Sequence, residues 1–151
     1  MAAGRLGHDG KLGIDDAVII TKSGDGHHTH KLETTDLTPA DVDVAGIYDG
    51  FTFITMAWLE ALGFCGKGES GPFIEGGHRI SLDGELPINT NGGGLSYTHT
   101  GMYGMFPLIE ATRQLRGECG ARQVPNVKLS LVNGMGGMLS AAATAVLSNE
   151  K

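Results

Sequence analysis

The sequence has few cysteines and no excess of basic residues. Cys65 and Cys119 are its only cysteines, and neither has a second cysteine at zinc-site spacing. Two reduced, idle thiols are therefore expected rather than a disulfide scaffold or a cysteine metal site. Lys and Arg number 11 against 17 Asp and Glu, which gives a net charge of −6. This balance argues against a nucleic-acid-binding role.

Long hydrophobic runs are also absent. No apolar run approaches the roughly 20 residues that a membrane helix needs, so no membrane span is expected. Residues 1–10 lack the apolar core of a signal peptide, which makes the cytoplasm the expected compartment. With 151 residues, of which 40% are hydrophobic, the chain has the length and composition of one globular domain.

Glycine is abundant, with 25 residues and no repeating period, which excludes a collagen-like chain. The most informative segment is 89–101, Asn-Thr-Asn-Gly-Gly-Gly-Leu-Ser-Tyr-Thr-His-Thr-Gly. Its consecutive glycines permit a close approach to the backbone, and Tyr97 and His99 can donate or exchange protons. A helix predicted to start near Gly104 would point free N–H groups at this loop. Together these features predict a site for a developing or resident negative charge.

Strand and helix patterns alternate along the chain. Apolar and β-branched runs predict strands over 17–21 and 42–47, and a closing strand pair over 127–132 and 138–147. Residues 141–145 are equally compatible with a short helix by propensity alone. The alternation indicates an α/β fold, with residues 1–15 as a loose N-terminal segment and 16–151 as the domain.

Two helices are predicted from apolar spacing. The first covers 50–62, with Asp49 as a possible N-cap and Gly63 as its stop. It is apolar nearly all round and is therefore expected to be buried. The second covers 104–116, ends at Gly117, and should turn four residues inward: Phe106, Ile109, Ala111 and Leu115.

The segment 89–101 resembles a motif of the C-terminal half of the thiolase superfamily, Asn-x-Asn-Gly-Gly followed by a Gly-His-Pro turn. His99 falls on the catalytic His of that turn, while Thr98 and Thr100 replace the Gly and the Pro. Residues 48–51, Tyr-Asp-Gly-Phe, stand where thiolases carry Asn-Glu-Ala-Phe. Further matches lie at 51–66, 110–117 and 131–137. They fit best the lipid-transfer or acetyl-CoA acetyltransferase-like branch, some of whose members are retro-aldolases acting on steroid side-chain CoA thioesters.

The resemblance implies a thiolase-like half, a mixed sheet covered by helices, with the C-terminal domain only. The N-terminal half that carries the family's nucleophilic Cys is absent, and the connection between His30 and Thr38 is shortened. The chain alone is therefore expected to be inactive. A thiolase N-terminal half or a homo-oligomer is the implied partner. The retro-aldolase branch further suggests a small OB-fold, zinc-ribbon acyl-CoA-binding protein.

The catalytic candidates are His99, Tyr48 and Tyr97. His99 would polarise a thioester carbonyl or stabilise an enolate. Tyr48 stands where thiolases have the Asn that holds an oxyanion-hole water, and a Tyr pair suits retro-aldol cleavage. The alternative is that His99 only hydrogen-bonds its loop and that both phenols cap a core.

Glycines of two segments are the substrate-binding candidates, with one neighbouring Asn. These residues are Gly92, Gly93, Gly94, Asn133, Gly134, Gly136 and Gly137. The second segment lies where condensing thiolases have a Cys-x-Gly proton shuttle, so the two-cysteine mechanism is not supported. A tight strand-to-strand turn is an equal interpretation of it.

A coenzyme A thioester is the expected substrate, with no separate cofactor. His27, His28 and His30 have His-x-His spacing, but no carboxylate or Cys nearby completes a set, so no metal is expected. The leading hypothesis is the C-terminal domain of an acyltransferase or retro-aldolase acting on acyl-CoA. The alternatives are a non-catalytic acyl-CoA-binding, lipid-binding or assembly subunit, and an inactive remnant.

Overall fold

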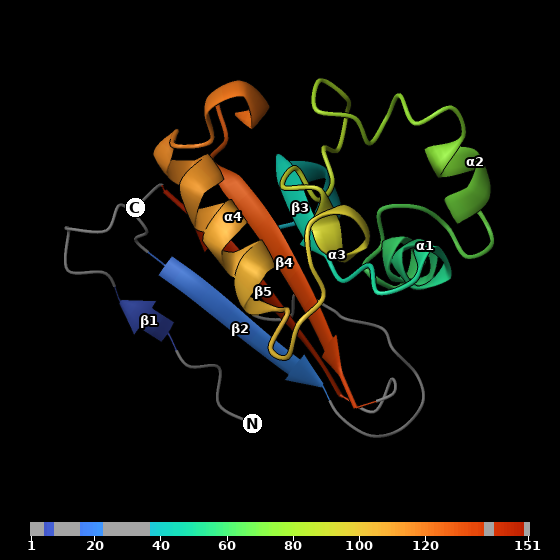
Figure 1. The fold of residues 1–151 in the computed structure, drawn as a ribbon, viewed down its shortest axis with the longest axis horizontal. Helices are drawn as coiled ribbons and strands as arrows, with labels where there is room; N and C mark the ends of the chain where they lie inside the picture. Colours follow the sequence, from blue (N-terminus) through green and yellow to red (C-terminus); the bar gives the residue numbers. More distant parts are fainter. Residues whose placement is uncertain (1–4, 8–15, 23–36, 138–140, 150–151) are drawn as a thin grey trace.

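The computed structural model describes residues 5–7, 16–22, 37–137 and 141–149. A mixed sheet of five strands forms its centre, in the order β1-β2-β5-β4-β3 (Figure 1). The strands are β1 (Arg5–Gly7), β2 (Asp16–Lys22), β3 (Val44–Ile47), β4 (Leu129–Gly136) and β5 (Ala141–Ser148). Among these described strands, β3 and β4 pair in parallel and the other neighbours are antiparallel. The α/β class with a mixed sheet is therefore confirmed.

The predicted closing strand pair is confirmed as the antiparallel β4–β5 pair, in which Asn133 faces Thr144. The alternative of a helix over 141–145 is wrong. Side chains of this pair alternate between the two faces of the sheet, with Leu131 opposite Val146 on one face and Val132 opposite Ala145 on the other. Because both faces bury apolar residues, pairing overrides the helix propensity of the alanines.

Helix α4 (Met105–Arg116) lies along one face of the sheet in Figure 1. The core beneath it consists of Val44, Ala111, Leu115, Val124, Val127, Val132 and Leu147. Helices α1 (Thr52–Ala61) and α2 (Ser70–Ile74) belong to the second core, on the other face. That core includes Ala45, Ile47, Trp58, Leu59, Leu62, Phe73, Leu131 and Val146.

Helix α1 forms as predicted, but two expectations about it are wrong. Its N-cap is Phe51 in an extended conformation, and Asp49 makes no cap. The helix is also buried on one face only, since Trp58 and Leu59 are buried while Phe53 is 74% exposed. Its end is as expected, because Gly63 takes the left-handed conformation, with φ of 83°.

Helix α4 also forms as predicted and ends at Gly117, which has φ of 71°. The inward direction assigned to Ile109 is wrong, since this residue is 46% exposed. The buried face instead carries two polar residues, Glu110 and Gln114, beside Ala111 and Leu115. Both polar side chains have hydrogen-bond partners, which makes their burial acceptable.

Four short helices in the described part of the chain were not predicted, namely α2 and, in addition, η1 (Pro39–Asp41), α3 (Gly93–Ser96) and η2 (Gly120–Arg122). Within the described ranges, no helix is long and apolar enough to cross a membrane.

Candidate active site

Tyr48 and His99 meet although they are 51 residues apart in the sequence. The phenol Oη of Tyr48 lies 2.8 Å from Nε2 of His99. Tyr48 directly follows β3, and its backbone N–H donates to the carbonyl of Asn133 on β4 at 3.1 Å. The parallel pairing therefore continues to Tyr48 and directs this residue to the end of the sheet, where the loop carrying His99 passes.

The loop is anchored to β3 by the side chain of Asn89. Its Nδ2 donates to the carbonyl of Ile47 at 2.9 Å, and its Oδ1 accepts the Ile47 N–H at 2.8 Å. The amide thus supplies both hydrogen bonds that a neighbouring strand residue would supply. Gly92 and Gly93 then turn the chain with φ of 101° and 67°. These left-handed conformations explain why glycine stands at both positions.

Asp49 fixes the next part of the loop. This buried carboxylate accepts the backbone N–H of Gly94 at 2.6 Å and that of Leu95 at 3.4 Å. A Cβ added at Gly93 would collide with the Asp49 carboxylate. Asp49, which from sequence was expected to cap the following helix, instead holds the glycine-rich turn against the end of β3.

Tyr103 completes a cluster of three rings. It stacks on His99 with ring centroids 5.6 Å apart and planes inclined by 13°. Its edge also meets Tyr48, with centroids 5.8 Å apart. Tyr103 is only 4% exposed. Burial, and after it the Asp49 carboxylate, raises the pKa of its phenol.

Tyr97 lies apart from this cluster. Its ring packs edge-on against Phe106, with centroids 5.7 Å apart, and is largely exposed. The idea that Tyr97 and His99 share one face required an extended backbone, but Tyr97 has φ of −93° and ψ of −67°. Among the described residues, the ring contacts of His99 are with Tyr48 and Tyr103.

The candidate residues of the second segment, 133–137, lie on the last part of β4 and directly after it. Asn133 is fully buried, and its Nδ2 donates to Oγ1 of Thr144 at 3.1 Å, so its side chain braces the β4–β5 pair. At Gly134 an added Cβ would make only an ordinary contact, 4.0 Å from Cα of Gly104 at the start of α4. Gly136 ends β4, and Gly137 follows with φ of 56°. Their role in substrate binding stays a prediction.

Neither cysteine is activated for nucleophilic chemistry. Burial and the nearby Glu110 carboxylate raise the pKa of the Cys119 thiol to about 11, and burial and Glu60 raise the pKa of Cys65. Over the ranges that the structure describes, no group of three or more His, Cys, Asp and Glu side chains is placed to hold a metal ion. His27, His28 and His30 lie outside the described residues.

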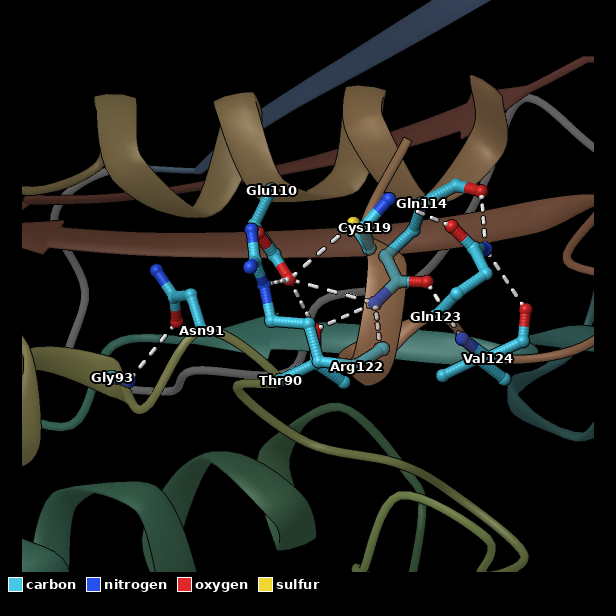
Figure 2. A network of polar contacts seen from close by, with 9 residues as sticks. All are labelled: Thr90, Asn91, Gly93, Glu110, Gln114, Cys119, Arg122, Gln123 and Val124. Carbon is cyan, nitrogen blue, oxygen red and sulfur yellow. Dashed lines mark hydrogen bonds and ion pairs between the residues drawn. The ribbon is translucent and has the colours of Figure 1, made fainter. Parts of the chain in front are cut away.

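A polar network supports the loop from the side of α4 (Figure 2). Glu110 accepts two hydrogen bonds from Arg122, at 2.8 Å to Nε and 3.0 Å to Nη2, and one from the Thr90 hydroxyl at 2.8 Å. Gln114 donates to Thr90 and to the carbonyl of Arg122. This network and Asp49 were not recognised as site supports from sequence, because their partners lie 8 to 46 residues away.

The fold and the loop are those of a thiolase-like half. A family model described as Thiolase C-terminal domain-like matches residues 26–149. The chain therefore belongs to the Thiolase C-terminal domain-like family, which confirms the resemblance found in the sequence. A solved structure named Ltp2-ChsH2(DUF35) aldolase superposes with a TM-score of 0.76 and 27% identity, over 90% of this chain and 40% of that chain.

Curated relatives point to the same branch. The 17-hydroxy-3-oxo-4-pregnene-20-carboxyl-CoA lyase of Mycobacterium tuberculosis is 53% identical over 81 residues, which are 54% of this chain and 20% of that protein. Sterol carrier protein 2 of Rattus norvegicus is 38% identical over 116 residues, 76% of this chain and 21% of that protein. The chain thus spans about a fifth of the length of these two relatives. It is a thiolase-like domain related to steroid side-chain aldolases and lipid-transfer proteins.

Proposed function

We propose that the Tyr48–His99 pair takes part in carbon–carbon bond cleavage of an acyl-CoA thioester by a retro-aldol reaction. The observation that carries this proposal is the 2.8 Å contact between Oη of Tyr48 and Nε2 of His99. A phenol and an imidazole at this distance can pass a proton between them. Similarity to a carboxyl-CoA lyase and to a solved aldolase supports the choice of reaction.

The chemistry needs one base and one stabilising donor. A base takes the proton from a β-hydroxyl group, and the resulting C=O forms as the bond between the α- and β-carbons breaks. The bonding electron pair moves into the thioester enolate, whose oxygen requires a hydrogen-bond donor. In the proposed step, Tyr48 takes the β-hydroxyl proton as its own phenol proton passes to Nε2 of His99. The imidazolium so formed donates from its other nitrogen to the enolate oxygen, and it supplies the proton that the enolate carbon then takes up.

The tyrosine pair inferred from sequence is replaced in this proposal by a tyrosine–histidine pair. Tyr97 was proposed as a second proton carrier, but its ring packs on Phe106. A thiolysis that uses two cysteines gains no support, because the pKa values of both thiols are raised. The substrate is therefore proposed to be a β-hydroxyacyl-CoA thioester, and coenzyme A the only carrier group.

The reaction is proposed to need a second thiolase-like half. Helix α1 is apolar nearly all round, yet Phe53 within it and Phe51 at its N-cap are 74% and 71% exposed. An apolar groove of about 190 Å³ lies between this helix and the β4–β5 pair, lined by residues such as Phe53, Trp58 and Met135. An all-round apolar helix is typical of the interior of a larger assembly. The name of the solved aldolase, Ltp2-ChsH2(DUF35), joins two components, which supports the proposal of an additional partner subunit.

The test uses the protein isolated from its own host with the partners that accompany it. Steroid β-hydroxyacyl-CoA cleavage is measured for the wild type, for Tyr48→Phe and for Tyr97→Phe as the matched control. We expect Tyr48→Phe to lower kcat by about 10²–10⁴-fold, the usual range for loss of a general acid or base, and the control to change it little. If Tyr48→Phe cleaves and binds acyl-CoA like the wild type, the proposal fails and a non-catalytic acyl-CoA-binding role is favoured.

A further inference from the structure

We infer that Tyr103 is a positioning residue that holds the imidazole of His99 in line with the phenol of Tyr48. The inference rests on the proposed function in one respect, since it is that proposal which gives His99 a catalytic role. Tyr103 contacts no reacting atom in this assignment, and it acts through the ring that it supports.

The ring geometry carries the inference. His99 is exposed, so one hydrogen bond to Tyr48 leaves its imidazole free to rotate about the side-chain torsions. Tyr103 covers one face of that imidazole, with planes inclined by 13°, and its edge meets Tyr48. Each of the three rings therefore contacts the other two, with centroids 5.6 to 5.8 Å apart. This arrangement restricts the imidazole to the plane in which Nε2 faces the phenol.

Tyr103 is itself held in place. It is almost completely buried, and its ring also contacts Phe106 on α4, with centroids 5.9 Å apart. Within the described part of the chain, its buried hydroxyl has no hydrogen-bond partner. The hydroxyl lies close enough to the Asp49 carboxylate for this charge to act on it. A buried ring with a neutral hydroxyl beside a carboxylate is a rigid support for a neighbour.

The glycine at position 94 allows this packing. A Cβ at Gly94 would lie 3.0 Å from Oδ1 of Asp49, 3.5 Å from Cδ2 of His99 and 3.5 Å from Cε2 of Tyr103. The space that a side chain at position 94 would fill is thus bordered by all three groups, and the Gly94 N–H donates to the Asp49 carboxylate. Asp49 and Tyr103 together fix both the loop and the imidazole that it carries.

The first measurement is independent of activity. In the full chain, NMR should show a nuclear Overhauser contact between the Tyr103 ring and Cδ2–H of His99, whose signals are assigned by their loss in His99→Gln. Stacking should also shift the His99 ring protons upfield. Absence of both signals in the wild type overturns the inference without any Tyr103 variant, so a folding defect cannot obscure the result.

The second measurement compares variants. Tyr103→Leu should lose the upfield shift of the His99 ring protons, whereas Tyr103→Phe, which keeps the ring, should preserve it. In the cleavage assay we expect Tyr103→Leu to lower kcat by about tenfold to 10²-fold with little change in KM, as for a misplaced catalytic group. Tyr103→Phe should restore most of that loss. Tyr97→Leu is the control and should leave the His99 signals unchanged.

The outcomes separate this inference from the proposed function. If Tyr103→Leu alters His99 but Tyr48→Phe has no effect on cleavage, the positioning role stands and the retro-aldol proposal fails. If Tyr48→Phe abolishes cleavage while Tyr103→Leu leaves both kcat and the shifts of the His99 ring protons unchanged, the positioning role is wrong and the proposed function stands.

Discussion

The Glu110 carboxylate on α4 accepts a hydrogen bond of 2.8 Å from the Thr90 hydroxyl, at the start of the glycine-rich loop. In Figure 2 the same carboxylate receives the guanidinium of Arg122, while Gln114 reaches the Thr90 hydroxyl from the next turn of α4. Helix, loop and the segment around Arg122 are thereby joined at one buried charge. The support of the loop depends on this charge being present.

Replacing Glu110 with Gln should destabilise the fold. The amide leaves Arg122 without its charged partner and offers only one oxygen to its donors, so we expect a loss of about 1–3 kcal/mol in the free energy of unfolding. Urea denaturation measures this loss. The exposed Glu118→Gln, on the segment after α4, is the matched control and should stay within about 0.5 kcal/mol of the wild type. Equal midpoints for both variants would contradict the role of Glu110.

Glu110 should also produce a pH dependence on the acid side. Burial alone raises the pKa of this carboxyl, but the hydrogen bonds from Arg122 and Thr90 outweigh burial and leave its pKa below the ordinary value. Its contribution to stability is therefore complete above the unfolded pKa of about 4.3 and is lost as the pH falls through the lower folded value. Between pH values of about 5 and 2, wild type should lose more stability than Glu110→Gln. If the unfolding free energies of the two proteins fall in parallel with pH, this role of Glu110 is wrong.

Tyr103 should produce a loss of stability on the alkaline side. Because burial and Asp49 raise the pKa of its phenol, the stabilising contribution is complete below the unfolded pKa of about 10 and is lost as the pH rises above it. Cys119, whose pKa is raised to about 11, contributes in the same direction and is removed by Cys119→Ser. In that background, Tyr103→Phe should flatten the fall in unfolding free energy above about pH 10. An unchanged slope would show that the phenol titrates normally.

Gly93→Ala should disturb the loop more than Gly101→Ala. Gly93 has φ of 67°, and its new Cβ would collide with the Asp49 carboxylate, whereas the space around Gly101 is open. We expect Gly93→Ala to cost at least about 1–3 kcal/mol, the usual strain at such a conformation. Gly101→Ala should cost less than about 0.5 kcal/mol. Thermal unfolding compares the two, and a similar melting temperature for both would show that the loop tolerates a side chain at position 93.

Much of the fold was predictable because it is encoded locally. Hydrophobic spacing located β2, β3, α1, α4 and the β4–β5 pair, and glycines marked the ends of both long helices. The wrong predictions concern side chains whose direction or role depends on partners that are distant in the sequence. Ile109 turns outward because Glu110 and Gln114 occupy the buried face with partners from other segments, and Asp49 serves the glycine loop instead of α1.

The sequence by itself determined the α/β class, the family and the two residues of the candidate pair that meet. Spacing and motif similarity carry that information because they depend on near neighbours along the chain. Only the tertiary structure decided which aromatic joins His99. Tyr97 is two residues away but turns to Phe106, whereas Tyr103 stacks on the imidazole. The reason is that the Asp49 and Asn89 hydrogen bonds set the loop conformation, and they reach across more than 40 residues to do so.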